Sequence, residues 1–401
     1  TQAPAEALVP HEGPAEASVA SVASVASVAS VAADYDRQLD AKHEALKALF
    51  AGLDIPAIEV FASAPQHYRM RAEFRIWHED DAICYAMFSP GQKASSATLQ
   101  RVEQFVPACE AINALMPRLL AAASADPVLR RRWYQVEFLA TLSGEMLVTM
   151  VYHRPLDDAW EAAARQLQTA LGIHVIGRSR GQKRVLSQDF VTERLEIPGP
   201  AGTPPAPFLY RQPEGAFTQP NARICERMIG WACEAVQQAG ISPASDLLEL
   251  YCGNGNFTLP LATRARQVIG VEGVKALVER GRQNALANRH ALLAPPGKDG
   301  VQFRVANLFE FDRAAWQALG RVDRLLIDPP RDGALAVARV LAALPPEQRP
   351  ARMVYVSCNP ATLARDLGLM VNEGKWRVRM AGVANMFPHT AHVESIALLE
   401  A

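Results

Sequence analysis

Short apolar runs alternate with longer amphipathic stretches throughout the second half of the chain. Five of these runs have the length and composition of buried strands, and a helical pattern follows each of them: 247–250, 268–271, 301–305, 325–327 and 353–356. Two more strand-like segments, near 376–383 and 393–399, end the chain. Five strand–helix units followed by a strand pair predict a doubly wound, Rossmann-like α/β sheet of seven strands with an edge hairpin.

The first half of the chain has a mixed pattern. Met70, Ala72, Phe74 and Ile76 alternate with polar residues, which is the period of a half-buried strand, and a return strand is expected over 82–88. The remaining segments predict a helix over 99–122, a hairpin over 133–152 turning at Ser143 and Gly144, a helix over 157–171 and a loop-rich segment over 177–184. Together they indicate an α+β domain with a partly antiparallel sheet.

The chain begins with a repetitive segment, in which Ser-Val-Ala occurs five times between residues 18 and 32. A period of three matches neither a helix nor a strand, so residues 1–33 are expected to form a disordered, low-complexity extension, with a weak alanine-rich helix as the alternative. From Asp34, the spacing of the leucines predicts an amphipathic helix packed on the domain that follows. Pro, Gly and Ala over 198–207 mark a boundary or a long loop. These features divide the chain into 1–33, an α+β domain over 34–210 and an α/β domain over 211–401.

Composition excludes several classes of protein. The chain is 49% hydrophobic and 21% charged, as in ordinary globular proteins, and a net charge of -1 means that any nucleic acid must bind to a local basic patch. Six cysteines lie far apart with no Cys-x-x-Cys pair, which disfavours a zinc site and suits a reducing cytoplasm. No stretch approaches about 20 strongly apolar residues, so no membrane span is expected.

The first strand–helix crossover of the α/β domain carries a glycine-rich turn. Gly253 and Gly255 follow the strand, and Glu272 ends the next strand 19 residues beyond Gly253. Glycine lets the backbone approach a ligand closely, and an acid at this spacing suits the two hydroxyls of a ribose. No third glycine follows to admit a pyrophosphate, so S-adenosylmethionine fits better than a dinucleotide; an ordinary tight turn is the alternative.

Cys358 is the candidate nucleophile. It stands between an apolar strand and Asn359-Pro360, which has the form of an N-cap followed by the first residue of a helix. A thiol at the N-terminus of a helix is expected to favour the thiolate, the form that attacks electrophiles. A buried structural cysteine is the alternative.

Two carboxylates lie at the ends of predicted strands, one after the fourth strand and one at the start of the last. Asp328 precedes a Pro-Pro pair at the end of the fourth strand, where α/β sheets bind ligands, and Arg331 stands where enzymes that methylate exocyclic amines carry an aromatic residue. An Asx turn is the alternative role for Asp328.

Glu394 would face Cys358 if the last strand runs antiparallel beside the fifth. A thiol, a carboxylate base and a methyl donor are what C5 methylation of a pyrimidine requires. Two weaker candidates, with structural roles as the alternative, are His389 and His392.

Five motifs occur in one order: Phe-Thr-Gln219-Pro-Asn, Glu-Leu-Tyr251-Cys-Gly-Asn-Gly-Asn256, Asp328-Pro-Pro-Arg, Ser-Cys358-Asn-Pro and His-x-Glu394. In this combination the chain, from about Asp34 to its end, resembles the RNA 5-methyluridine methyltransferases. Residues 67–78 are similar to the tRNA (uracil-5)-methyltransferase branch, which makes the T-loop ribothymidine. The iron–sulfur cysteine cluster of ribosomal RNA relatives has no counterpart here, since only Cys84 and Cys109 precede residue 200.

The resemblance implies a function and a set of roles. Cys358 would be the nucleophile and Glu394 the base in the transfer of a methyl group from S-adenosylmethionine to C5 of a uridine in the tRNA T-loop. The residues implied to contact S-adenosylmethionine are Gln219, Tyr251, Asn256, Glu272 and Asp328. The resemblance also implies no metal and no iron–sulfur cluster, and we expect a cytoplasmic monomer that does not bind a membrane.

RNA contacts are expected from the N-terminal domain. The candidate residues are Arg69, Arg71, Arg75, Arg178, Arg180, Lys183 and Arg184. A solvated strand face, on which Glu73 pairs with neighbouring arginines, is the alternative. Other functions stay open: the same chemistry on ribosomal RNA or a tRNA-like RNA, methylation of an exocyclic amine or of DNA cytosine, and a non-catalytic RNA chaperone.

Overall fold

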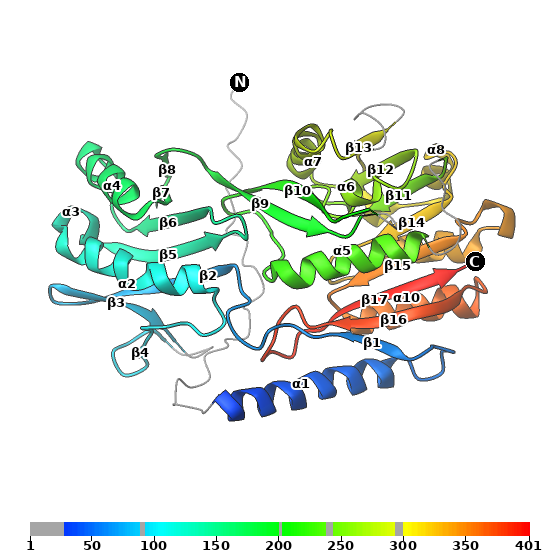
Figure 1. Ribbon diagram of the computed structural model, residues 1–401, viewed down its shortest axis with the longest axis horizontal. Helices are drawn as coiled ribbons and strands as arrows, with labels where there is room; N and C mark the ends of the chain where they lie inside the picture. Colours follow the sequence, from blue (N-terminus) through cyan, green and yellow to red (C-terminus); the bar gives the residue numbers. More distant parts are fainter. Residues whose placement is uncertain (1–27, 89–92, 200–202, 238–243, 293–299) are drawn as a thin grey trace, which may run out of the picture.

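The computed structural model describes residues 28–88, 93–199, 203–237, 244–292 and 300–401, and two β-sheets dominate this part of the chain (Figure 1). The N-terminal sheet has, in spatial order, β4 (Gln100–Arg101), β3 (Ala82–Met87), β2 (Arg71–Glu79), β5 (Trp133–Ala140), β6 (Met146–Tyr152), β7 (His174–Ser179) and β8 (Gln182–Val185). Its helices are α2 (Glu110–Ala125), α3 (Pro127–Arg130) and α4 (Asp158–Leu171).

The C-terminal sheet has, in spatial order, β1 (Ile58–Phe61), β16 (Arg377–Ala384), β17 (Glu394–Glu400), β15 (Arg352–Ser357), β14 (Arg324–Ile327), β11 (Asp246–Leu250), β12 (Gln267–Glu272) and β13 (Val301–Val305). Its helical elements are α1 (Val28–Leu49), α5 (Ala222–Gln237), α6 (Thr258–Leu261), α7 (Lys275–Ala287), η1 (Leu308–Glu310), α8 (Arg313–Ala318), α9 (Leu335–Ala343), η2 (Pro346–Gln348) and α10 (Pro360–Asn372). In the described residues, no helix combines the length and apolar character that crossing a membrane requires.

Strand β2 has the alternation that its sequence predicts. Ala72, Phe74 and Ile76 are buried in the same core as the apolar residues of α2 and α4. Arg71 and Arg75 are only partly buried and belong to the opposite face of the sheet, which we call the arginine face. The N-terminal domain therefore has one helix-covered face and one face that carries charge.

Two expectations for the N-terminal domain are wrong. The helix expected over 99–122 begins only at Glu110, because the chain first forms the short strand β4 and a loop. The Asn113 side chain, in α2, forms hydrogen bonds with the backbone of Phe105 in this loop. The loop expected over 177–184 is instead the hairpin β7–β8, which turns at Gly181 with φ of 70°. Polar residues hide this hairpin in the sequence, because few apolar positions alternate along it.

The C-terminal sheet is covered on both faces, as a doubly wound fold requires. Met353 and Tyr355 of β15 pack into one core, whereas Val354 and Val356 pack into the other. β11 to β15 are parallel, and β17 runs antiparallel between β15 and β16. The predicted α/β fold and the predicted insertion of the last strand beside the fifth are confirmed.

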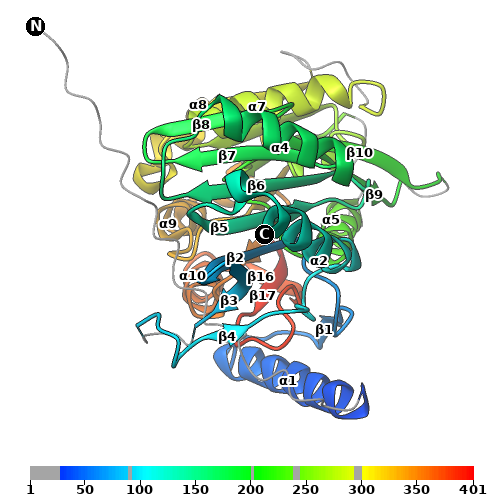
Figure 2. The same cartoon turned by 90° about the vertical axis from the view of Figure 1, so that its left-hand side faces the viewer.

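The first helix packs on the C-terminal sheet and not, as expected, on the domain that follows it. Leu46 and Phe50 are buried in a core of the C-terminal domain, and α1 contacts α10, β1 and β16. In both views α1 lies below β1 and β16, away from α2 and α4 (Figure 1, Figure 2). β1 pairs in parallel with β16 and adds an eighth strand to the predicted seven. An apolar stripe shows that a helix is packed, but not against which partner.

A two-stranded ribbon lies between the two sheets in the chain. Its strands are β9 (Phe190–Ile197) and β10 (Ala206–Pro213), so the proline-rich stretch over 198–207 is largely their connection. β9 contacts β6 and α5, and β10 contacts α7, so the ribbon touches both domains. The division of the chain at residue 210 stays a prediction. The extension predicted over 1–33 lies outside the described residues except for 28–33, which begin α1.

Candidate active site

Cys358 and Glu394 come together where β15 ends and β17 begins. The last register pair of these antiparallel strands is Ser357 with Ser395, so Cys358 and Glu394 occupy the next position. Successive side chains alternate between the faces of a sheet, so the thiol and the carboxylate leave the face opposite to the two serines. The charge of Glu394 raises the pKa of Cys358, which shows that the groups are close. The predicted juxtaposition is confirmed; the roles of nucleophile and base stay predictions.

Cys358 stands at the predicted strand-to-helix junction. The Asn359 side chain accepts a hydrogen bond from the Ala361 N–H at 3.2 Å, and Pro360 is the first residue of α10. The Ser357 hydroxyl accepts from the Asn359 N–H at 3.1 Å and donates to the Asn359 carbonyl at 3.0 Å. These bonds fix the backbone on both sides of the thiol.

The expected lowering of the thiol pKa is wrong. Burial raises the pKa of Cys358 to about 11, and the charges of Glu394 and Asp328 act in the same direction. The Arg331 guanidinium lowers this pKa, but it does not compensate for burial and two carboxylates. Burial also holds the pKa of Glu394, which is 4% exposed, well above its usual range. Burial thus raises the pKa of both the thiol and the carboxyl group of this pair.

Arg331 belongs to the motif Asp328-Pro-Pro-Arg, but the sequence assigned it no role in the site. Its carbonyl accepts hydrogen bonds from the Asn359 side chain at 2.9 Å and the Thr362 hydroxyl at 3.2 Å, which ties it to the start of α10. Its Nη2 lies 2.8 Å from Nδ1 of His392, in the turn before Glu394. Its charge lowers the pKa of both Cys358 and Glu394. The signal in the sequence was its position three residues after Asp328.

Glu272 lies beside the glycine-rich turn, as its spacing predicts. Its Oε2 accepts from the Gly253 N–H at 3.1 Å and its Oε1 from the Val274 N–H at 2.9 Å. A Cβ added to Gly253, whose φ is 54°, would meet open space. The turn thus presents a carboxylate and a bare backbone beside an unfilled volume.

The turn itself needs an unusual backbone. Tyr251 has φ of 63°, which is rare for a residue other than glycine and marks a strained position. Gly255 has φ of 91°, and a Cβ there would lie 2.9 Å from the Phe303 ring. Glycine is therefore required at position 255 by both backbone angle and space.

Two other predicted cofactor residues, Asn256 and Gln219, lie directly after this turn and in the loop before α5. The Asn256 side chain donates to the Cys225 sulfur at 3.3 Å, and the backbone carbonyl of Asn256 accepts from the Tyr210 hydroxyl at 3.0 Å. Gln219 is partly buried in the loop between β10 and α5. The neighbouring Pro220 carbonyl accepts from the Met70 N–H at 2.8 Å, which joins this loop to the N-terminal domain.

Asp328 connects the two ends of the site. Burial and the charge of Glu272 raise its pKa to about 7, and its own charge raises the pKa of Cys358 and Glu394. The charge of Asp328 therefore links the glycine-rich turn, through Glu272, with the thiol–carboxylate pair at the carboxyl edge of the sheet. Among the described residues, no group of three His, Cys, Asp or Glu side chains is arranged to hold a metal ion.

The predicted RNA-binding residues do not form one cluster. Arg178 pairs with Glu214 at 2.5 Å, Lys183 lies 3.4 Å from the same carboxylate, and Arg71 donates to the Ala216 carbonyl at 3.1 Å. These three basic residues thus hold the 214–219 loop, which leads to Gln219, on the arginine face.

The remaining basic candidates make other contacts. Arg75 stacks on Tyr134, with Cζ 3.8 Å from the ring centre. Arg69 donates to the Arg71 carbonyl, and Arg180 is exposed at the turn of the β7–β8 hairpin. Arg184 faces α4, where it pairs with Glu161 at 2.8 Å.

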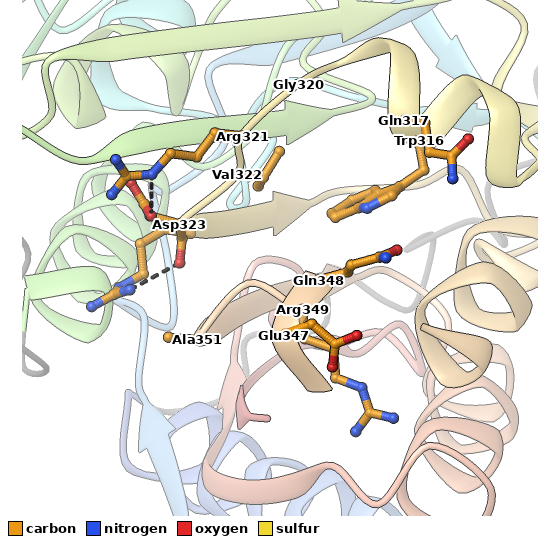
Figure 3. A pocket seen from close by; sticks show the side chains of 11 residues that line it. Trp316, Gln317, Gly320, Arg321, Val322, Asp323, Glu347, Gln348, Arg349 and Ala351 are labelled. Carbon is orange, nitrogen blue, oxygen red and sulfur yellow. Dashed lines mark hydrogen bonds and ion pairs between the residues drawn. The ribbon is translucent and has the colours of Figure 1, made fainter. Parts of the chain in front are cut away.

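A separate cavity of about 580 Å³ opens at the other edge of the C-terminal sheet (Figure 3). It lies where β14 and β15 begin, between Trp316, Arg321 and Arg349, and contains none of the predicted site residues.

His389, the other weak candidate, has a structural contact: its Nε2 lies 2.7 Å from the Pro65 carbonyl oxygen.

Comparison with known proteins shows which family the chain resembles. The family model for tRNA (Uracil-5-)-methyltransferase matches residues 34–401. A tRNA/tmRNA (uracil-C(5))-methyltransferase of Neisseria meningitidis is 47% identical over 373 residues, covering 92% of this chain and 98% of the relative. An enzyme of the same name from Pseudomonas putida strain KT2440 is 43% identical over 377 residues, covering 92% of this chain and 97% of the relative.

The fold is also found among solved structures. The tRNA (uracil-54, C5)-methyltransferase of Pyrococcus abyssi, in complex with S-adenosyl-L-homocysteine, superposes with a TM-score of 0.66 at 21% identity, covering 91% of this chain and 83% of that chain. The match of the family model over nearly the whole described chain shows that this protein belongs to the tRNA (uracil-5-)-methyltransferase family.

Proposed function

We propose that this enzyme transfers a methyl group from S-adenosylmethionine to C5 of a uridine in the tRNA T-loop, giving 5-methyluridine. The observation that carries the proposal is the position of Cys358 beside Glu394 at the carboxyl edge of the sheet. Family membership and relatives named tRNA/tmRNA (uracil-C(5))-methyltransferases support the substrate class. The word tmRNA in those names also favours a tRNA-like RNA as a second substrate.

The residues around the glycine-rich turn fit S-adenosylmethionine. Glu272 suits the ribose hydroxyls, and the open volume at Gly253 lets a ligand approach the backbone. Tyr251, Asn256, Asp328 and Gln219 would complete the contacts. When bound here, S-adenosylmethionine supplies a methyl group on a positively charged sulfur, which an electron-rich carbon can displace.

The site residues solve the problem that C5 of uracil is a poor nucleophile. Addition of the Cys358 thiolate to C6 forms a carbon–sulfur bond and moves an electron pair toward O4, which makes C5 electron-rich. After C5 is methylated, Glu394 removes its proton; the electrons of that C–H bond restore the C5–C6 double bond and release the thiolate. Arg331 favours the ionised forms of both groups. Burial raises the pKa of Glu394, which makes its carboxylate a stronger base than an exposed one.

The arginine face is the proposed RNA interface. Tyr134 stacks with His153 at a ring distance of 3.6 Å, beneath Arg75, which gives an aromatic and cationic surface of the kind that nucleotide bases stack on. Phe217 is 75% exposed in the loop that leads to Gln219. The target uridine must leave its stack to reach Cys358, at a cost of a few kcal/mol that contacts on this face would offset.

The direct test is methyl transfer from labelled S-adenosylmethionine into unmodified tRNA, followed by mapping of the modified base. We expect one 5-methyluridine in the T-loop. Label in another base, or label in ribosomal RNA but not in tRNA when both are offered separately, would contradict the substrate assignment. Label in an exocyclic amine would contradict the chemistry. An RNA chaperone would show no label and would keep its activity in Cys358→Ser. A monomeric state and a cytoplasmic location stay expectations.

A further inference from the structure

A buried lysine from the first helix holds the turn that precedes Glu394. Lys42 is 4% exposed, and its Nζ donates to Asn385 Oδ1 and to the Phe387 carbonyl oxygen, both at 2.8 Å. Burial lowers the pKa of Lys42 to about 8. A buried ammonium costs free energy of desolvation, which its two acceptors must offset. Such a group fixes the geometry of the segment that it bonds.

Other residues of the N-terminal segment bind the same turn. The Tyr68 hydroxyl donates to the Pro388 carbonyl at 2.9 Å, and Nε2 of His389 lies 2.7 Å from the carbonyl oxygen of Pro65. The Tyr35 ring meets the His389 ring edge-on at 5.9 Å. The partners in the two hydrogen bonds are at least 320 residues apart in the sequence. Residues 385–392 are therefore held in place by four residues near the N-terminus: Tyr35, Lys42, Pro65 and Tyr68.

This turn is connected to two site residues, Glu394 and Arg331. It begins after Ala384, whose register partner is Glu394, and Asn385 is its first residue. Inside the turn, the Thr390 hydroxyl donates to the Phe387 carbonyl at 2.9 Å and accepts from the His392 N–H at 3.2 Å. The same residue, His392, contacts Arg331. The bonds of Lys42 thus reach the carboxylate and the guanidinium of the site through one short segment.

We propose that Lys42 is a positioning residue for the elimination step, because its bonds to the 385–392 turn hold Glu394 where it can remove the C5 proton. The proposal rests on the proposed function. It predicts a specific defect: addition of Cys358 and methylation would proceed, but release of the methylated RNA from the thiol would slow.

The test compares Lys42→Met, which keeps the length of the side chain but removes the donor, with Lys47→Met, an exposed lysine on the same helix. Unmodified tRNA and S-adenosylmethionine are mixed with each enzyme, and the fraction of protein covalently bound to RNA is measured after quenching in detergent. We expect kcat of Lys42→Met to fall about 10- to 100-fold, with little change in KM, while methylated adduct accumulates. The Lys47→Met enzyme should match the unchanged enzyme.

An unchanged kcat, or slower turnover without accumulated adduct, would overturn the proposal. If Lys42→Met fails to fold, Tyr68→Phe decides, because it removes only the hydroxyl that bonds the same turn. Accumulation of adduct in Tyr68→Phe supports the proposal, and none overturns it. Failure of the proposed function would look different: either the unchanged enzyme would put no label into tRNA, or Cys358→Ala would still methylate it.

Discussion

Ser357 and Ser395 form the last register pair of β15 and β17, and this pair places Cys358 beside Glu394. β17 lies directly beside β15 and runs antiparallel to it. The residue after Ser357 and the residue before Ser395 therefore come side by side. The thiol and the carboxylate therefore share the carboxyl edge of the sheet with Asp328 and the glycine-rich turn.

Replacing Glu394 with Gln should separate the two halves of the reaction. The amide keeps the shape of the side chain but cannot take up the C5 proton, so turnover should fall roughly 10²- to 10⁴-fold. Addition at C6 and methylation should persist, and methylated RNA should stay bound to Cys358. Single-turnover assays with detergent gels measure both quantities. Normal turnover by Glu394→Gln would show that another group is the base.

The reactivity of Cys358 should rise with pH. Because its pKa is raised to about 11, the thiol of the free enzyme is protonated at neutral pH and gains thiolate only above it. Asp328→Asn removes a charge that raises this pKa, so its profile should move to lower pH. The rate of iodoacetamide labelling at the Cys358 peptide, followed by mass spectrometry, gives both profiles. A midpoint at or below about 8.5 in the free enzyme would contradict the structure.

Gly255→Ala should damage the cofactor site more than a comparable glycine change elsewhere. A Cβ at position 255 adds both a strained φ and a contact of 2.9 Å with Phe303, and we expect a loss of about 1–3 kcal/mol in unfolding free energy and weaker S-adenosylmethionine binding. Gly144→Ala is the control, since Gly144 has φ of 94° with nothing near its Cβ. Thermal melts and calorimetric titration compare them. Equal effects would mean that strain alone matters.

Lys183→Ala should weaken RNA binding, because it removes a cation from the arginine face. The slope of log affinity against log salt should flatten by about 1 if Lys183 contacts a phosphate. Arg165→Ala is the control, since Arg165 lies on α4 and pairs with Glu161. Filter binding at several salt concentrations measures the slope. Equal slopes for Lys183→Ala and the unchanged enzyme would remove Lys183 from the interface.

Strong periodic signals were enough to predict the catalytic half of the fold. Buried strands such as Met353 to Val356 are apolar on both faces, so their type and order could be predicted, and the spacing of Glu272 from Gly253 identified the cofactor turn. The partner of α1 could not be predicted, because Leu46 and Phe50 would pack equally well on any apolar surface.

The electrostatics of the site were not predictable from local sequence either. The helix N-terminus at Cys358 suggested a lowered pKa, but burial and two carboxylates from distant strands dominate. The contacts of Lys42 and Arg331 were missed for the same reason, since their partners lie far away in the chain.

The most direct test of the account is to trap the bond to Cys358. Incubation with S-adenosylmethionine and tRNA that carries 5-fluorouridine leaves no proton at C5 to remove, so the reaction should stop at a covalent adduct. Peptide mass spectrometry should then find one methylated fluorouridine attached to Cys358, and Cys358→Ala should form no adduct. Attachment to another cysteine, or normal tRNA methylation by Cys358→Ala, would contradict the central claim.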